Sequence, residues 1–274
     1  MQVKKTGGQR EDFDRGKFCK SLTYAGAPVA LAQKVCAIVE GEISPGITTN
    51  ELFRKAARYL VREDFLAGAQ YRLRRAVGDL GPAGFIFEQY LEIILQAYGY
   101  TTERNVIVQG ECVTHEIDII ARKDNRTFYV EAKYHNERGL KTHIDRVMYM
   151  EARVEDIARR KVAAEGERDR IPWLVTNTKC TQHAIMYAKC RHFKLTGWDF
   201  PHQESLKDII VQKKLFPVTV LPSVNRAARE VFAQHNMLLA QDLLPFQVTD
   251  LVQLGVSEHT AERILREAQR LMSE

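Results

Sequence analysis

Two consecutive stretches with the pattern of β-strands carry acidic residues among apolar ones. In HEIDIIARKDNRTFYVEAK (115–133), apolar and polar residues alternate on both sides of a polar centre, which is the period of half-buried strands. If Asp124 and Asn125 form a tight two-residue turn, the strands pair as a hairpin in which Asp118 faces Glu131. Facing residues have Cβ atoms about 5 Å apart. The fold must therefore accommodate two neighbouring carboxylates.

Neighbouring carboxylates repel each other unless a positive charge lies between or beside them. A Mg²⁺ ion provides that charge, because it binds oxygen ligands and often uses one or two protein carboxylates. Lys133 then lies where it can orient a water molecule or neutralise an attacked phosphate. The alternative is a surface salt-bridge cluster in which Lys133 and Glu116 bridge the two acids. His115 is either a further site residue or an incidental histidine at the end of a loop.

The composition predicts a globular chain of two or three units without a membrane segment. Of its 274 residues, 45% are hydrophobic and 27% are charged, and the net charge of +5 is compatible with a polyanionic partner. No apolar run approaches the roughly 18 residues of a membrane span, and the polar start MQVKKTGGQR has no signal-peptide core. The five cysteines include no CxxC pair. We therefore expect reduced thiols in the cytoplasm, and neither a disulfide framework nor a zinc site.

The pattern of elements divides the chain into three predicted parts. Residues 1–82 are mainly helical, and the Thr-Thr-Asn-Glu sequence that opens TTNELFRKAARYLVRED is typical of a helix cap. Residues 83–222 alternate between helix and strand, which predicts an α/β domain. Residues 223–274 form a small helical C-terminal part. We therefore predict a multidomain protein.

The central part resembles the Mrr-like restriction endonucleases of the PD-(D/E)xK superfamily. The resemblance rests on Asp118, on Glu131-Ala132-Lys133 in an apolar strand, on the preceding helix GFIFEQYLEIILQAYGY, and on the block IPWLVTNTKCTQHAIMYAKCRHFKLTGWDF. It implies a mixed sheet flanked by helices and Mg²⁺-dependent hydrolysis of DNA. Many Mrr-like proteins have Gln where this chain has Glu131, which is the form of the broader superfamily.

The resemblance assigns roles to five residues. It implies that Asp118 and Glu131 hold Mg²⁺ or Mn²⁺, that the carbonyl oxygen of Ala132 is a further ligand, and that Lys133 activates the attacking water. Glu88 occupies the place of a helix glutamate that assists the metal in many relatives. A solvated glutamate at the flank of the helix is the alternative for Glu88.

We also predict contacts to the DNA backbone, because phosphates receive most protein–DNA hydrogen bonds. The candidates are Thr176, Thr178 and Lys179, followed by further basic residues at Lys189, Arg191 and Lys194. A solvated helix face explains the same basic residues.

The N-terminal part resembles an ATP-cone, a small helical domain that binds ATP or dATP as a regulator. The resemblance rests on VKKTGGQREDFDRGKFCKSL, ITTNELFRKAARYLV and AQYRLRR. It implies the following nucleotide-binding residues: Val3, Lys5, Glu11, Lys17 and Thr49. Thr6 stands where the family usually has arginine. The alternative is a basic helical dimerisation domain that does not bind nucleotides.

The tail LVQLGVSEHTAERILREAQRLM resembles a helix–hairpin–helix, which binds the DNA backbone through amides at the start of a helix. Ser257 replaces the usual second glycine of that motif. Core packing and an oligomerisation helix are the alternatives.

Together these patterns predict a cytoplasmic, metal-dependent deoxyribonuclease that ATP or dATP regulates. The nucleotide is expected to be an effector, since no hydrolytic motif accompanies it, and a homo-oligomer is expected on family grounds. A nonenzymatic, nucleotide-responsive DNA-binding regulator on a nuclease-like fold is the alternative function. A nuclease that acts on RNA is a second alternative.

Overall fold

The chain folds into two compact units. The computed structural model describes residues 2–5, 8–81, 84–137, 139–160 and 169–274. The helical unit comprises Met1–Ala76 together with Val218–Glu274, and the α/β unit comprises Val77–Pro217. The predicted division into three parts stays a prediction. Its first boundary, at 82–83, and Thr6 both lie outside the described residues.

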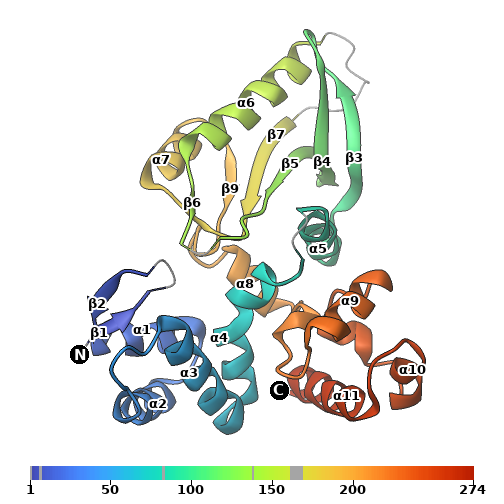
Figure 1. The fold of residues 1–274 in the computed structure, drawn as a ribbon. Helices are drawn as coiled ribbons and strands as arrows, with labels where there is room; N and C mark the ends of the chain where they lie inside the picture. The colour runs from blue at the N-terminus through green and yellow to red at the C-terminus, as the bar shows by residue number, and fades with distance from the viewer. Residues whose placement is uncertain (1, 6–7, 82–83, 138, 161–168) are drawn as a thin grey trace. The chain divides into compact units, whose positions relative to one another are not determined.

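A five-stranded mixed sheet forms the centre of the α/β unit (Figure 1). The strand order is β3-β4-β5-β7-β9, in which β3, β4 and β5 are antiparallel and β5, β7 and β9 are parallel. The short strands β6 and β8 pair separately. In chain order the elements are α5 (Gly84–Ala97), β3 (Thr101–Gln109), β4 (Thr114–Lys123), β5 (Arg126–Lys133), β6 (Lys141–Thr142), α6 (Ile144–Arg159), β7 (Asp169–Thr176), β8 (Lys179–Cys180), α7 (Gln182–Cys190), β9 (Lys194–Thr196) and α8 (Leu206–Gln212). The predicted α/β domain with a mixed sheet and flanking helices is confirmed.

The hairpin of β4 and β5 has the predicted register. Asp124 and Asn125 form its two-residue turn, and their φ angles of 51° and 61° are both positive. Asp and Asn tolerate this left-handed conformation, and such turns match the twist of the paired strands. The ladder runs from the turn to the pair Ile119 and Val130. The turn therefore fixes which residues face each other near the proposed site.

Helices α6 and α7 cover one face of the sheet (Figure 1). The buried residues of α6 recur every three or four positions, as expected of a helix with one face in the core: Val147, Met150, Val154 and Ile157. They belong to one apolar cluster with Tyr129 and Leu174 of the sheet. This packing fixes the polar residues of α6 relative to β5.

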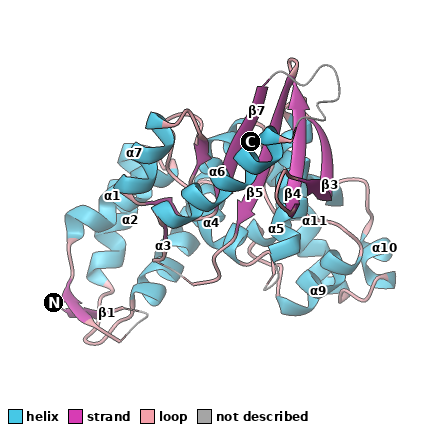
Figure 2. Ribbon diagram, turned by 90° about the horizontal axis from the view of Figure 1, so that it is seen from above, coloured by secondary structure: helices cyan, strands magenta, loops and turns pink. Residues whose placement is uncertain are grey.

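Among its described residues, the helical unit has β1 and β2 as its strands, which form one short hairpin, and is otherwise built of helices and loops (Figure 2). Its described elements are β1 (Gln2–Lys4), β2 (Arg10–Asp12), α1 (Arg15–Ala25), α2 (Val29–Gly41), α3 (Thr49–Glu63), α4 (Phe65–Gly78), η1 (Val218–Val220), α9 (Arg226–Gln234), η2 (Ala240–Leu243), α10 (Val248–Gln253) and α11 (Glu258–Ser273). In the described parts of the chain, no helix has both the length and the apolar character needed to cross a bilayer.

The predicted cap of α3 is present. The Thr48 hydroxyl accepts a hydrogen bond from the Glu51 amide, and the Glu51 carboxylate accepts one from the Thr48 amide. This reciprocal arrangement satisfies amides that would otherwise be unpaired at a helix start. It fixes the position at which α3 begins.

A glycine permits the close approach of α3 and α4. A Cβ atom at Gly68 would lie 2.6 Å from the backbone nitrogen of Val61 and 2.7 Å from its Cα. Backbone atoms cannot move aside as the end of a flexible side chain can. The contact between these two helices therefore requires a residue without a side chain.

We expect Gly68→Ala to destabilise the chain by about 1–3 kcal/mol, the usual cost of forcing extra volume into a packed contact. Thermal unfolding followed by circular dichroism would measure the change. Gly41→Ala is the control, because a Cβ at Gly41 would meet no atom within 4 Å. Equal stability of the two variants would contradict the expectation.

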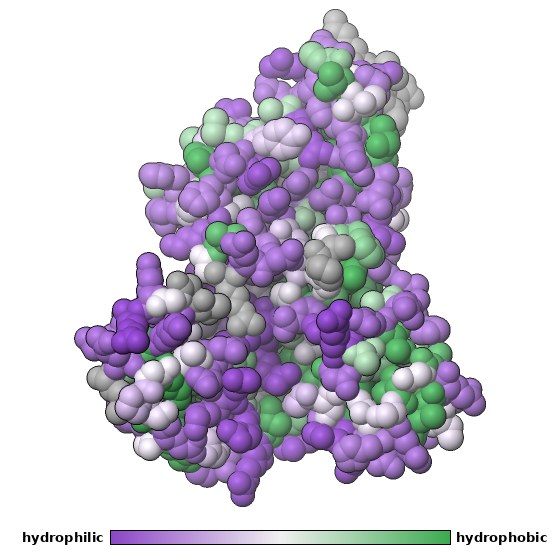
Figure 3. All heavy atoms as spheres, viewed as in Figure 1, coloured by the Kyte–Doolittle hydropathy of each residue, from purple (hydrophilic) through white to green (hydrophobic). Residues whose placement is uncertain are grey.

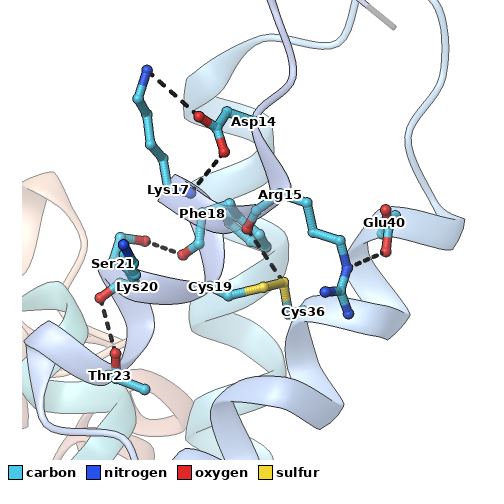
Figure 4. The surroundings of a disulfide bond; sticks show 10 residues. All are labelled: Asp14, Arg15, Lys17, Phe18, Cys19, Lys20, Ser21, Thr23, Cys36 and Glu40. Atoms are coloured by element: carbon cyan, nitrogen blue, oxygen red, sulfur yellow. Dashed lines mark hydrogen bonds and ion pairs between the residues drawn. A yellow bond between two sulfur atoms is a disulfide. The ribbon is translucent and has the colours of Figure 1, made fainter.

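One expectation about the cysteines is wrong. Cys19 of α1 and Cys36 of α2 form a disulfide, with Cα atoms 5.5 Å apart (Figure 4). Cys112, Cys180 and Cys190 remain free. The cysteine spacing did not indicate this bond, because it depends on how two helices pack. The disulfide ties α1 to α2 within the helical unit.

Candidate active site

The proposed catalytic residues lie where β4 and β5 separate. The ladder between these strands stops at Ile119 and Val130. Beyond this pair, the amide of Ala132 donates a hydrogen bond of 2.7 Å to Oδ2 of Asp118. The regular ladder thus stops one pair before Asp118 and Glu131, so their direct pairing stays a prediction. The Asp118 carboxylate instead takes the place of a backbone acceptor at the end of the hairpin.

Burial and neighbouring charge strongly perturb Asp118. Burial is the largest cause that raises its pKa, to about 7, and the negative charge of Glu131 raises it further. Glu88 adds a smaller effect in the same direction, while the Ala132 amide and Arg153 oppose it. The acids thus lie close enough to influence one another.

Glu88 of α5 lies in this acidic environment and not at a fully solvated helix flank. Its side chain is half-buried, and burial is the main cause that raises its pKa. Arg104 opposes this shift, whereas Glu116 and Glu131 reinforce it. The structure therefore places Glu88 near the proposed pair.

Arg153 of α6 is a neighbour that the sequence did not indicate. Its Nη1 lies 2.7 Å from Oε2 of Glu131, and the two side chains are only 11% and 23% exposed. Arg153 stands on the polar side of an amphipathic helix, so nothing in the local pattern distinguishes it from a solvated residue. It holds one oxygen of Glu131 in place.

Lys133 lies two residues beyond Glu131 on β5 and is half-buried. Among the residues that the structure describes, none forms an ion pair or side-chain hydrogen bond with its ammonium group. The alternative in which Lys133 and Glu116 bridge the acids is therefore not what the structure shows. Arg153 instead pairs with Glu131, and the Lys133 ammonium remains available for a ligand.

The donor set suits a hard cation such as Mg²⁺. Asp118, Glu131 and the carbonyl of Ala132 offer oxygen ligands, which Mg²⁺ and Mn²⁺ prefer. Burial, and after it the charge of Glu131, raises the pKa of Asp118. Glu88 does not join them in a tight three-residue cluster, because among the described residues only another group has three ligand atoms within 4.8 Å of one another. The residues therefore fit a two-carboxylate site.

That other group stabilises the turn between β3 and β4. It consists of Glu111, Cys112 and Asp156. The Asp156 carboxylate accepts hydrogen bonds from the amides of Cys112 (2.9 Å) and Val113 (3.4 Å), and it lies 2.7 Å from Nε2 of His115. These contacts join the turn to α6. His115 therefore has a structural partner away from the proposed site.

Thr176 and Thr178 are not positioned for DNA contact, which corrects the prediction from the sequence. They are 0% and 3% exposed. Their hydroxyl groups lie 3.1 Å apart, and each lies 3.0 Å from the hydroxyl of Thr142. A phosphate cannot reach hydroxyls that are buried and bonded to one another. Lys179 differs, since 45% of its side chain is exposed, although it is paired with Asp199.

Two of the predicted nucleotide-binding residues form an ion pair on the N-terminal hairpin. The Lys5 ammonium lies 2.6 Å from the Glu11 carboxylate. Val3 pairs with Glu11 across the hairpin and is only 3% exposed. Its side chain is therefore in the core, and only its backbone is suited to contact a ligand.

The other two predicted nucleotide-binding residues lie at helix starts. Lys17, in the first turn of α1, is 83% exposed and lies 3.6 Å from Asp14. Thr49 is the first residue of α3. A parallel bridge between Lys4 and Thr48 brings the start of α3 beside β1. The structure thus brings the hairpin and Thr49 together.

Comparisons with known proteins agree with this architecture. Residues 83–202 match the family described as "Restriction endonuclease" (Mrr_cat), and residues 216–272 match "AF1548-like, C-terminal". An uncharacterized protein of Archaeoglobus fulgidus is 31% identical over 179 residues, which are 65% of this chain and 98% of that protein. The crystal structure of a protein of unknown function, AF1548, is similar with a TM-score of 0.56 and 29% identity. That similarity covers 70% of this chain and 99% of the other.

These matches define the central part as a restriction endonuclease-like domain of the Mrr type. The chain belongs to the AF1548-like family. Neither family match reaches the first 82 residues, so the comparisons do not assign the N-terminal segment.

We expect Asp118→Asn to stabilise the metal-free chain increasingly as pH rises from 4 to 8. The folded pKa of about 7 lies above the unfolded value of about 3.9. Between these values the folded chain binds more protons, so its stability falls as pH rises. Asparagine removes that loss and retains an acceptor for the Ala132 amide.

Thermal unfolding in EDTA at several pH values would measure this effect. Asp145→Asn is the control, because Asp145 is exposed on the same unit. A stability difference between Asp118→Asn and the unsubstituted chain that is the same at pH 4 and pH 8 would contradict the expectation.

Proposed function

We propose that the chain is a Mg²⁺-dependent deoxyribonuclease whose α/β unit hydrolyses phosphodiester bonds of DNA. The observation that carries the proposal is the proximity of Asp118 and Glu131 at the open end of one hairpin, with Lys133 two residues beyond Glu131 on the same strand. These residues lie inside the segment that matches restriction endonucleases. Mn²⁺ is expected to replace Mg²⁺, since both accept oxygen ligands. The cytoplasm remains the proposed location.

In this mechanism the protein residues position the reactants. Asp118 and Glu131 would hold the ion together with the Ala132 carbonyl, and the bound cation would lower the charge barrier at the scissile phosphate. Lys133 would donate to the attacking water or to a phosphate oxygen, where negative charge develops. Its lack of a carboxylate partner among the described residues is consistent with this role.

Two further residues support these groups. Arg153 holds Oε2 of Glu131 at 2.7 Å, which restricts the orientation of that carboxylate. Glu88 would act on a water bound near the metal, since it is not in a tight cluster with the other acids. Both are positioning residues in the proposal.

We further propose that ATP or dATP binds the helical unit as an effector. Lys5 and Lys17 would contact the phosphates, Thr49 the edge of the base and Val3 the base through its backbone, while Glu11 would keep Lys5 in place. The adjacency of β1 and the start of α3 supports this assignment. Regulation requires the nucleotide to bind one conformational or oligomeric state more tightly than another. A homo-oligomer is part of this proposal.

Replacing the lysine tests the catalytic proposal directly. We expect Lys133→Ala to lower the rate of DNA cleavage by about 100-fold or more, which is the usual contribution of a proton-transferring or charge-stabilising group. Plasmid and linear DNA would be incubated with Mg²⁺ or Mn²⁺, with and without ATP, and parallel RNA substrates would test the RNA alternative. Lys213→Ala, an exposed lysine of the same unit, is the control.

Equal cleavage by Lys133→Ala and the unsubstituted chain would indicate a contaminating nuclease. Absence of cleavage under every condition, with DNA binding retained, would favour the nonenzymatic DNA-binding regulator. Cleavage of RNA alone would replace DNA as the substrate.

The nucleotide proposal has its own test. We expect Lys17→Ala to weaken ATP or dATP binding about tenfold, or roughly 1.4 kcal/mol, because a charge-assisted contact to phosphate is lost. Isothermal titration calorimetry would measure the affinity. Arg226→Ala removes another exposed cation of the helical unit and serves as the control. Unchanged affinity in Lys17→Ala would remove this residue from the site.

A further inference from the structure

A cavity in the helical unit is lined by three arginines and no acid. Its volume is about 460 Å³, and its wall includes Arg54 and Arg58 of α3, Arg72 of α4, the ring of Phe53, and Pro222. Natural ligand sites have volumes of about 300–1,000 Å³. The cavity therefore combines a suitable size with a charge of one sign.

The two arginines of α3 are available to a ligand. Arg54 and Arg58 are exposed, and among the described residues neither has an ion pair or side-chain hydrogen bond. They are one turn apart, which is about 6 Å along the helix axis. Arg62, one turn further, is also exposed and extends the row beyond the cavity.

Contacts with the rest of the unit hold the wall of the cavity in place. Nε of Arg72 donates a hydrogen bond of 3.0 Å to the Val220 carbonyl. Next to it, the Arg75 guanidinium stacks 3.2 Å above the Phe53 ring centroid and donates to Oδ1 of Asn50. A guanidinium that is already oriented loses less entropy when it binds an anion.

Positive charge is concentrated in these two helices. Residues 49–78 contain seven basic and three acidic side chains, a surplus of four in a chain whose net charge is +5. In Figure 3, hydrophilic side chains, drawn in purple, are numerous on the helical unit, with apolar side chains in green among them. The unit thus presents a local field that attracts polyanions.

The cavity is distinct from the proposed nucleotide site. Arg58 follows Thr49 by nine residues, which at 100° per residue places it on the opposite side of α3. The buried Leu52, Ala56 and Leu60 form the face of this helix that packs into the unit. A nucleotide held by the hairpin and Thr49 would therefore not occupy the arginine-lined cavity.

We propose that the arginine-lined cavity and the row Arg54, Arg58 and Arg62 bind the phosphate backbone of DNA. Guanidinium groups match phosphate oxygens in a bidentate geometry. The row continues past the cavity, which suits an extended polyanion better than a single small anion. The choice of DNA as the polyanion rests on the proposed function of the α/β unit. The helical unit then has a DNA-holding surface of its own.

Salt-dependent binding measures the phosphate contacts. The full chain with Lys133→Ala, in EDTA, would be titrated into a fluorescent DNA duplex at several KCl concentrations. Each phosphate contact to duplex DNA contributes about −0.9 to the slope of log affinity against log salt. We expect Arg54→Ala/Arg58→Ala to make that slope less negative by about 1.8 and to weaken binding to duplexes of different sequence equally.

Two further double variants make the result decisive. Arg10→Ala/Lys20→Ala removes two exposed cations elsewhere in the unit and is expected to leave the slope unchanged. Arg54→Lys/Arg58→Lys keeps the charge and is expected to retain most of the salt dependence of the unsubstituted residues. An unchanged slope in Arg54→Ala/Arg58→Ala, or loss of ATP binding with DNA binding intact, would overturn the proposal. The assay contains no free metal and uses the Lys133→Ala chain. Its result can therefore be interpreted even if the nuclease proposal fails.

Discussion

The hydrogen bond from the Ala132 amide to Asp118 determines the geometry of the proposed site. It ends the ladder between β4 and β5 and holds the carboxylate at the point where the strands part. The same amide favours the charged form of Asp118, while burial and Glu131 oppose it. The protein therefore keeps two acids close together at an energetic cost, which the proposed divalent cation would lower. Strongly perturbed pKa values of this kind are frequent at functional sites.

The sequence predicted local structure better than contacts between distant elements. The turn at Asp124 and Asn125, the hairpin register and the cap at Thr48 all follow from local chemistry, and the structure contains them. The contact of Arg153 with Glu131 could not be read in the same way, because α6 and β5 are joined only through tertiary packing.

The same limit explains the wrong expectations. A disulfide requires two helices to bring Cys19 and Cys36 together, and cysteine spacing does not encode that approach. Thr176 and Thr178 have the polar character of a binding loop, but their burial depends on Thr142 from another part of the chain. Polar residues in a turn thus identify a candidate surface only when their exposure is known.

The helical unit is made from both ends of the chain, and this has a consequence for synthesis on the ribosome. Thr219 donates to the carbonyl of Ala76, and the Leu66 amide donates to Glu274, so late residues complete a unit begun by early ones. The whole α/β unit leaves the ribosome before Val218–Glu274 does. Since domains generally fold as they emerge, the carboxylate site can assemble while the helical unit is still incomplete. A newly made chain therefore passes through a stage in which its α/β unit exists without a finished helical unit.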